Sequence, residues 1–243
     1  MKRLLLVTLL LITGLVLPGY SDQKVTTVES EARTGRPVAQ FSSWVLFRGG
    51  RVVQGAPFLI YGFLSQIGEL PQLTQLLKNE SSAVLTFVVE GTARDLKRGE
   101  GALLIESEGT LRVFFDPQAK RDFAEPRSFR TGKEVATYTL QRQVLLNPDG
   151  GWLFDRSFAQ LTSSQDFTID KTEINLSRLW GARLTLRSQA RAGDSLPSPV
   201  PEFSGAIPYL GQIFIDAERT ERQSFTPTIV THRDFSAHGR NWG

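Results

Sequence analysis

His232 and His238 are the only histidines in this 243-residue chain, and Asp234 lies between them. Imidazole and carboxylate groups are common metal ligands, so these three residues could form a weak metal site. Six residues is an odd spacing for two ligands on one secondary-structure element, and the surrounding tail is largely polar. We therefore expect two solvated histidines here and predict no metal-binding residue.

Paired carboxylates are the next candidates for chemistry. Glu106 and Glu108 point the same way on a predicted strand and could act as a general acid and base. Gly109 follows them, which predicts an exposed hairpin tip and favours solvated side chains. The sequence has no nucleophile elbow, no phosphate-binding glycine loop and no dinucleotide fingerprint. We predict a protein that is not an enzyme, although a hydrolase site assembled from distant residues stays an alternative.

The complete absence of cysteine excludes several further chemistries. The chain has no disulfide, no thiolate zinc site, no iron–sulfur cluster and no cysteine nucleophile. A domain of about 220 residues is large enough to be held together by its hydrophobic core alone. We accordingly expect a well-packed interior.

Short runs of β-branched and aromatic residues, separated by turn residues, fill most of the chain from residue 82 onward. Glu106–Gly109 and Asn147–Gly151 are the turns with the clearest composition. Short strands at this spacing predict a sandwich or a barrel. The expected strands are Val84–Val89, Ala102–Ile105, Thr110–Phe115, Val135–Leu146, Trp152–Phe158, Phe167–Leu176, Ala182–Ser188 and Gly211–Ala217.

The remaining segments complete the predicted fold class. Phe58–Ile67 is either an amphipathic helix or a strand with a turn, whereas Leu70–Lys78 is a short helix with leucines on one side. Gly193–Pro208 is rich in proline, serine and glycine and is expected to be a long loop. The sequence therefore predicts an all-β protein: an antiparallel β-barrel with a long loop insertion and a short helical segment near the N-terminus.

The N-terminus has the features of a secretory signal. Lys2 and Arg3 precede an apolar run, Leu4–Leu17, and small residues follow it. That run has 14 residues, whereas a membrane span needs roughly 20, so a cleavable signal is favoured over an anchor. We expect a signal peptide over residues 1–21, a mobile arm over 22–40, a barrel domain over 41–218 and a tail over 219–243.

Export changes the charge balance. The exported chain would carry 26 basic and 25 acidic residues, because two of the basic residues lie in the signal. A general nucleic-acid-binding domain is expected to be strongly basic, so we predict no nucleic-acid partner. A rigid β scaffold with projecting loops is better suited to docking on another molecule.

The order of the motifs resembles the manganese-stabilising extrinsic protein family of photosystem II, the PsbO family. The similarity spans residues 58 to 218 and depends on collinear order, since each motif by itself is a β-turn with its strands. It is carried by Leu59–Gly68, Gly101–Leu111 (similar to a family hairpin), Leu145–Gly151, the pair Phe154 and Asp155 with Leu161 after it, Phe167–Leu176 and Tyr209–Ile215.

This resemblance implies a non-catalytic, extrinsic subunit, peripheral to the membrane, in a thylakoid lumen or on a periplasmic face. Its partners would be the core and antenna subunits of photosystem II and other extrinsic subunits. It would stabilise and shield the manganese–calcium cluster of the oxygen-evolving complex without ligating the metal. The docking residues that the resemblance implies are Tyr61, Gly68, Arg142, Asn147, Asp149, Gly150, Gly151 and Asp155, with contacts also expected from the segment Phe58–Gly68 and the loop Gly193–Pro208.

Several departures from the family pattern affect this interpretation. The family's cysteine pair is absent, and the charges of its Asp-Pro-Lys-Gly-Arg-Gly turn are lost or inverted in Asn147–Gly151. Docking with altered electrostatics is therefore expected. The alternative is a lipocalin-like secreted barrel that binds a small apolar ligand, which requires an open apolar lumen. Large side chains expected to point inward argue for a filled barrel: Phe87, Phe115, Tyr138, Phe154, Phe167 and Phe214.

Overall fold

The structure is a computed structural model. It describes residues 26–27 (backbone only), 36–48, 53–68, 79–99, 101–118, 120–147, 151–169 and 171–216. Several predicted features lie outside these residues: the signal peptide, the helix Leu70–Lys78, the two histidines and the tail over 219–243. Nearly all of the expected barrel domain lies within them.

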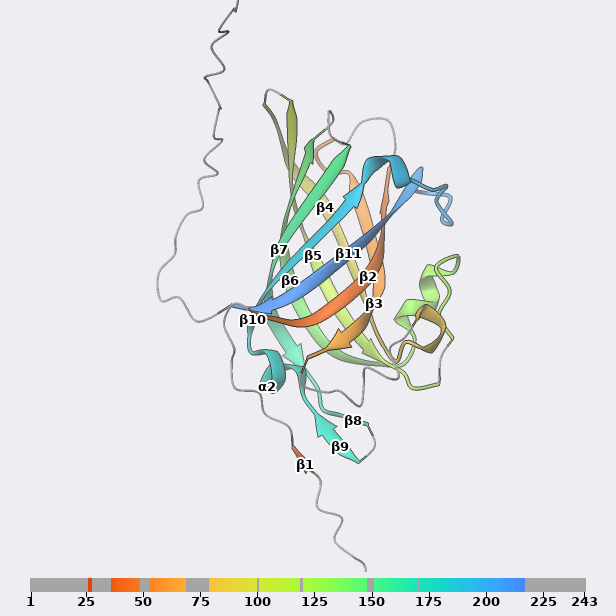
Figure 1. Ribbon diagram of the computed structural model, residues 1–243, viewed down its shortest axis with the longest axis vertical. Coiled ribbons are helices and arrows are strands. Elements are labelled where there is room, and N and C mark those ends of the chain that lie inside the picture. The colour runs from red at the N-terminus through yellow and green to blue at the C-terminus, as the bar shows by residue number, and fades with distance from the viewer. Residues whose placement is uncertain are drawn as a thin grey trace, which may run out of the picture.

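Eight antiparallel strands close into a barrel (Figure 1). Their order around the barrel is β10-β11-β2-β3-β4-β5-β6-β7, so consecutive strands are neighbours except where β8, β9 and α2 intervene. The predicted all-β antiparallel barrel is confirmed. The strands are β2 (Pro37–Phe47), β3 (Pro57–Ile67), β4 (Leu85–Gly99), β5 (Ala102–Phe115), β6 (Lys133–Asn147), β7 (Trp152–Ser164), β10 (Arg183–Arg191) and β11 (Gly205–Ile215).

The two ends of the barrel differ. At one end, called here the hairpin end, loops join β2 to β3, β4 to β5, β6 to β7 and β10 to β11. At the other, the helix end, β7 is followed by β8 (Phe167–Ile169), β9 (Thr172–Ile174) and the short helix α2 (Leu176–Trp180) before β10 begins. Strand β1 (Thr26–Thr27) pairs with β9 in parallel (Figure 1).

Helix α2 closes the helix end of the barrel. Asn175 caps its N-terminus by accepting a hydrogen bond from the backbone N–H of Ser177, and Gly181 ends it with a φ of 74°. Leu176, Leu179 and Trp180 are buried and join the core inside the barrel. A short helix with apolar residues on its inner side thus seals an end that the strands alone would leave open.

Strand β5 corrects one sequence prediction. It is continuous from Ala102 to Phe115, so Glu106–Gly109 is neither a turn nor a hairpin tip. The turn lies between β4 and β5, where Gly99 pairs with Ala102 and Gly101 has a φ of 70°. Gly109 is needed for close approach instead, because a Cβ there would lie 2.5 Å from the carbonyl oxygen of Glu90. A glycine between polar residues predicts a turn, but its role here is to let two strands pass closely inside the barrel.

Other boundaries also differ from the prediction. Phe167–Leu176 is not one strand, because Lys171, with a φ of 70°, separates β8 from β9. The expected long loop Gly193–Pro208 is shorter, since β11 begins at Gly205 and Leu196 forms an isolated bridge with Ala206. Strand β2 begins at Pro37, inside the segment expected to be a mobile arm. Proline and glycine, which predicted a loop, are tolerated where a strand begins.

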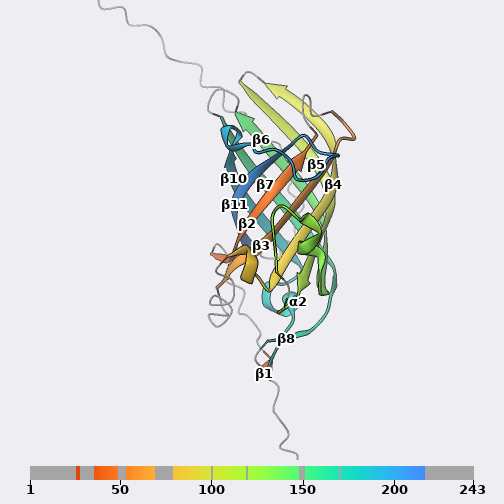
Figure 2. The ribbon, with the colours of Figure 1, turned by 90° about the vertical axis from the view of Figure 1, so that its right-hand side faces the viewer.

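A second hydrophobic core lies on the outside of the barrel. The segment between β5 and β6 contains the 3-10 helix η2 (Pro126–Arg130) and lies over β3 and β4 (Figure 2). Phe123 and Phe129 from this segment pack against Tyr61 of β3, with ring centroids 5.7 Å and 5.1 Å from the tyrosine ring. The outer side of β3 is therefore buried as deeply as its inner side.

Candidate functional site

A buried ion pair lies inside the barrel, in the half nearer the hairpin end. Arg142 on β6 donates from Nε to Oδ2 of Asp155 on β7, at 2.6 Å. The exposed fractions of the two side chains are 6% and 5%. Both residues were predicted to dock a partner, and the structure joins them to each other instead. Both side chains therefore face the interior of the barrel and not its surface.

The surrounding residues hold this pair in place. Ser157 donates from Oγ to Oδ1 of Asp155 at 3.1 Å, so both carboxylate oxygens are satisfied. The guanidinium of Arg142 lies 5.0 Å from the centre of the Phe58 ring, a cation–π distance. Phe58 fits there because Gly91 faces it, and a Cβ on Gly91 would lie 2.6 Å from Cζ of the phenylalanine. Gly91 therefore leaves space for the Phe58 ring, and the ring in turn contacts the buried charge of Arg142.

Tyr209 on β11 completes this polar group. Burial raises the pKa of Tyr209 to about 12, the nearby charge of Asp155 acts in the same direction, and Arg142 acts against both. The phenol therefore stays neutral at any physiological pH. A buried arginine, a carboxylate with both oxygens satisfied and a neutral phenol form a structural network.

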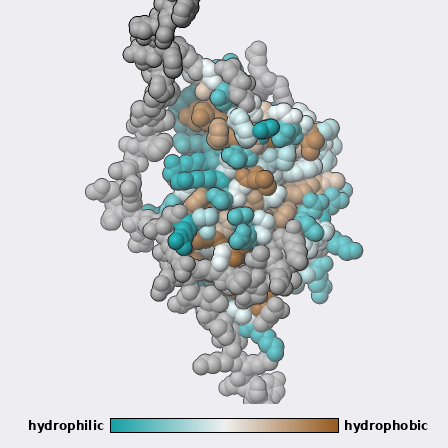
Figure 3. Space-filling view, viewed as in Figure 1, coloured by the Kyte–Doolittle hydropathy of each residue, from teal (hydrophilic) through white to brown (hydrophobic). Residues whose placement is uncertain are grey.

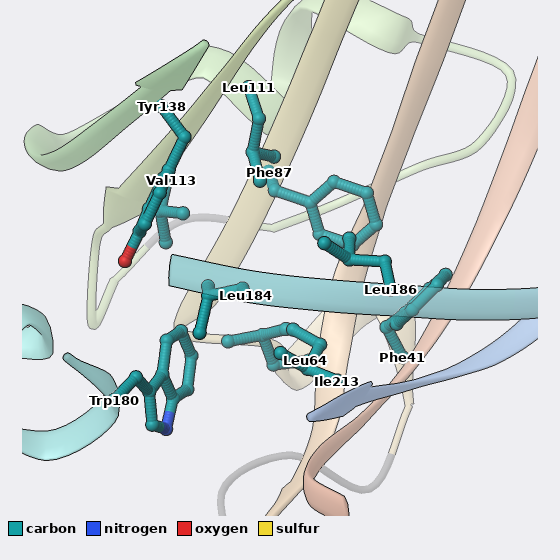
Figure 4. A pocket seen from close by; sticks show the side chains of 10 residues that line it. All are labelled: Phe41, Leu64, Phe87, Leu111, Val113, Tyr138, Trp180, Leu184, Leu186 and Ile213. Carbon is teal, nitrogen blue, oxygen red and sulfur yellow. The ribbon is translucent and has the colours of Figure 1, made fainter. Parts of the chain in front are cut away.

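The barrel interior near the helix end is closely packed. Ten side chains converge near the helix end and leave a cavity of about 10 Å³ (Figure 4), at the lower limit for one water molecule. Two of the lining residues carry a polar side-chain atom, the phenol oxygen of Tyr138 and the indole nitrogen of Trp180, and neither atom has a hydrogen-bond partner. The lining residues are Phe41, Leu64, Phe87, Leu111, Val113, Tyr138, Trp180, Leu184, Leu186 and Ile213.

The other predicted docking residues are dispersed. Tyr61 is fully buried in the outer core, where its hydroxyl donates to the carbonyl oxygen of Phe123 at 2.8 Å, so the docking role predicted for it does not fit its position. Gly68 is exposed at the helix end, whereas Asn147 and Gly151 flank the β6–β7 turn at the hairpin end. Asp149 and Gly150 lie outside the described residues. These positions do not form one continuous surface.

The segment predicted to dock through Phe58–Gly68 is mainly strand β3. Phe58, Ile60 and Leu64 belong to the core inside the barrel, and Phe63 belongs to the outer core. Only the end of the segment is exposed. The apolar residues of this segment are thus used by the fold itself.

The carboxylates considered for acid–base chemistry lie on the outside of the barrel and form ion pairs. Glu106 accepts from Nζ of Lys97 at 2.9 Å, and Glu108 pairs with Arg94 at 2.9 Å. Within the described ranges, histidine, aspartate and glutamate side chains nowhere form a group of three that could hold a metal ion. The same part of the chain holds no helix long and apolar enough to cross a membrane.

The sequence reasoning missed one surface, the outer face of β6, β7, β10 and β11. Phe154 and Phe214 were expected to point inward, but Phe154 is 48% exposed and Phe214 lies on the outer side of β11. In β7 the small or polar residues Asp155, Ser157 and Ala159 point inward and the aromatic residues point outward. The alternation of aromatic with small or polar residues was visible in the sequence. Aromatic residues usually face the interior, but in β7 they face outward.

Fold and interior together define the class of this protein: a closed, eight-stranded antiparallel barrel that holds, among the described residues, an apolar core and a buried ion pair in its interior. Comparisons of the chain with protein families, with curated proteins and with solved structures find no match.

Proposed function

We propose that this protein is a non-catalytic, extrinsic subunit of photosystem II that shields the manganese cluster of the oxygen-evolving complex. It acts after export, on the lumenal or periplasmic face of a photosynthetic membrane. It binds no cofactor itself and works beside the manganese–calcium cluster, where exclusion of water and fixed dipoles tune a metal site. The partner class follows from the sequence resemblance to the PsbO family.

The observation that supports this proposal best is the filled barrel. A carrier of small apolar ligands needs a lumen of several hundred cubic ångströms, whereas the cavity that lies inside the barrel near the helix end measures about 10 Å³. The lipocalin-like alternative therefore has little support. A filled barrel acts through its outer surface, as an extrinsic subunit does.

The resemblance now depends on fewer segments. Gly101–Leu111, which is similar to a family hairpin, lies almost entirely in the single strand β5. The turn between β6 and β7 and the strand β11 are where the resemblance places a turn and a closing strand. These elements and their order support the choice of partner.

A reconstitution experiment tests the proposal. Photosynthetic membranes are washed with salt to remove extrinsic subunits, the purified protein is added back, and oxygen evolution and manganese release are measured. We expect the protein to rebind and to slow manganese loss. Heat-unfolded protein is the control. Failure to rebind, together with normal oxygen evolution in a strain that lacks the gene, would exclude the proposed function.

A further inference from the structure

Three exposed apolar side chains lie in one row across the outer face of the barrel. Leu145 of β6 is paired with Phe154 of β7. Gln189 of β10 connects the row, because it is paired with Phe154 on one side and with Leu210 of β11 on the other. The exposed fractions of the three apolar residues are 42%, 48% and 69%. Three strand spacings of about 4.8 Å give the row a length of roughly 14 Å. Aligned exposure of this kind marks an interaction surface more often than scattered apolar residues do.

Arginines flank this row on both sides. Arg191 lies over the ring of Trp152, 4.6 Å from its centre, and Trp152 stacks on Phe154 with ring centroids 6.3 Å apart. On the other side Arg187 lies 4.9 Å from the centre of the Phe214 ring. Figure 3 shows apolar and hydrophilic side chains side by side on the face that carries β10 and β11. The rings hold the guanidinium groups in place and leave their N–H donors available.

No carboxylate in these strands neutralises the two arginines. Asp155 is the one acidic residue of β7, β10 and β11, and it lies inside the barrel in its pair with Arg142. Within the described ranges, neither Arg187 nor Arg191 forms an ion pair. We call the surface made by Leu145, Trp152, Phe154, Arg187, Arg191 and Leu210 the arginine face.

The opposite side of the barrel shows the contrast. On β4 and β5, Arg94 pairs with Glu108 and Lys97 pairs with Glu106, each at 2.9 Å. Arg112 and Arg130 share the carboxylate of Glu90. Each of these four basic side chains has a carboxylate partner within the chain, whereas Arg187 and Arg191 have none among the described residues.

We propose that the arginine face docks on an acidic protein surface that also exposes apolar side chains; this rests on the proposed function and names its contact surface. Charge complementarity selects an acidic partner. A protein is favoured over nucleic acid or anionic lipid because the arginines lie beside exposed apolar and aromatic side chains, and because β7, β10 and β11 contain no lysine. Arginine with tryptophan and phenylalanine, and few lysines or acids, is the composition of protein interfaces.

The test uses three double variants of the full chain. R187E/R191E reverses the charge of the arginine face, and F154S/L210S removes its apolar row. R94E/R98E changes the net charge equally on β4, far from the face, and serves as the matched control. Circular dichroism and thermal unfolding first confirm that each variant folds. Binding is then measured to salt-washed photosystem II membranes and, separately, to poly-L-glutamate.

We expect both face variants to bind the membranes at least tenfold more weakly than the wild type, and the control to bind within threefold of it. R187E/R191E should also lose its binding to poly-L-glutamate. If the wild type binds the membranes and the face variants bind equally well, the face is wrong while the proposed function stands. If the wild type does not bind the membranes, the proposed function fails. Binding to poly-L-glutamate, and its loss in R187E/R191E, then decides whether the arginine face binds acidic groups.

The remaining measurements decide the class of partner. Phosphatidylglycerol vesicles and a twenty-nucleotide oligothymidine are offered to the same proteins at physiological salt. We expect weak binding that R187E/R191E and R94E/R98E reduce equally, because both variants lower the positive charge by the same amount. Tight binding to either probe that only R187E/R191E removes would overturn the choice of a protein partner.

Discussion

Arginine occupies two opposite settings on β6 and β10, the two strands that pair with β7. Inside, Arg142 is 5% exposed and shares a hydrogen-bonded ion pair with Asp155. Outside, Arg187 and Arg191 lie on aromatic rings without an ion pair among the described residues. A buried charge that is paired within the chain is needed for stability, because its removal leaves its buried partner without a counter-charge. A charge that the fold leaves unneutralised on an exposed face contributes little to stability and is available to a partner.

The largest effect should come from breaking the interior pair. Asp155→Ala leaves the guanidinium of Arg142 buried without a counter-charge, and such changes cost about 3–5 kcal/mol. We expect that loss in the free energy of unfolding, measured with urea. The double variant R142M/D155L replaces both charges with apolar groups and should recover most of the loss. Equal destabilisation by the single and double variants would show that the pair itself stabilises the fold.

A smaller effect should follow from crowding the ring that supports Arg142. In Gly91→Ala the new Cβ would lie 2.2 Å from the carbonyl oxygen of Glu108 and 2.6 Å from the Phe58 ring. Overpacking of this kind costs about 1–3 kcal/mol. Gly99→Ala, on the same strand with no atom within 4 Å of its Cβ, is the matched control and should change the free energy of unfolding by less than about 0.5 kcal/mol.

Two tyrosines give a third, finer comparison between inside and outside. Tyr61, in the outer core, donates to Phe123, whereas Tyr138, inside the barrel, has a buried hydroxyl without a partner. Tyr61→Phe should lower the free energy of unfolding by about 1 kcal/mol. Tyr138→Phe should leave it unchanged or raise it, because the phenol that it removes is desolvated and unpaired. Thermal and urea unfolding of both variants measure the difference, and equal losses would contradict the assignment.

The smallest effect concerns pH and the outer ion pairs. The hydrogen bond from Arg130 is the main cause that holds the pKa of Glu90 below its ordinary value of 4.5. A depressed carboxylate pKa stabilises the fold above pH 4.5, and this stabilisation is lost as pH falls through the folded-state pKa. Glu90→Gln should therefore cost less than about 1 kcal/mol at neutral pH.

Two controls follow from the lowered pKa of Glu90. The stability difference between Glu90→Gln and the wild type should vanish in acid, and it should shrink in high salt because the side chain is 46% exposed. A difference that grows as the pH falls would contradict the assigned direction.

Particular residues show which parts of the fold were predictable. Phe87 and Tyr138 were expected inside the barrel and are found there. Phe154 was expected beside them and is exposed. All three lie in alternating strands, and alternation says which residues share a side without saying which side faces the interior. Only the pairing of β7 with β6 and β10 fixed that choice for Phe154.

The predicted site shows the same limit. Arg142 and Asp155 were both selected from the sequence, as separate contacts on the surface. Their 13-residue separation gives no reason to join them, and it is the β6–β7 register that places both on the inner side of adjacent strands. The arginine face was hidden for a similar reason, because its row joins β6, β7, β10 and β11, and β11 lies far along the chain.

The sequence by itself predicted most of the strands after residue 82, several of the turns and a well-packed interior without disulfides, because these follow from local composition and side-chain volume. The tertiary structure decided which arginine is buried, which aromatic rings face outward and where Gly109 is needed, because these depend on register and on barrel closure between β2 and β11. A shift of one residue would exchange the two sides of a strand. The difference between Arg142 and the arginine face is therefore a property of the closed barrel and not of any single segment.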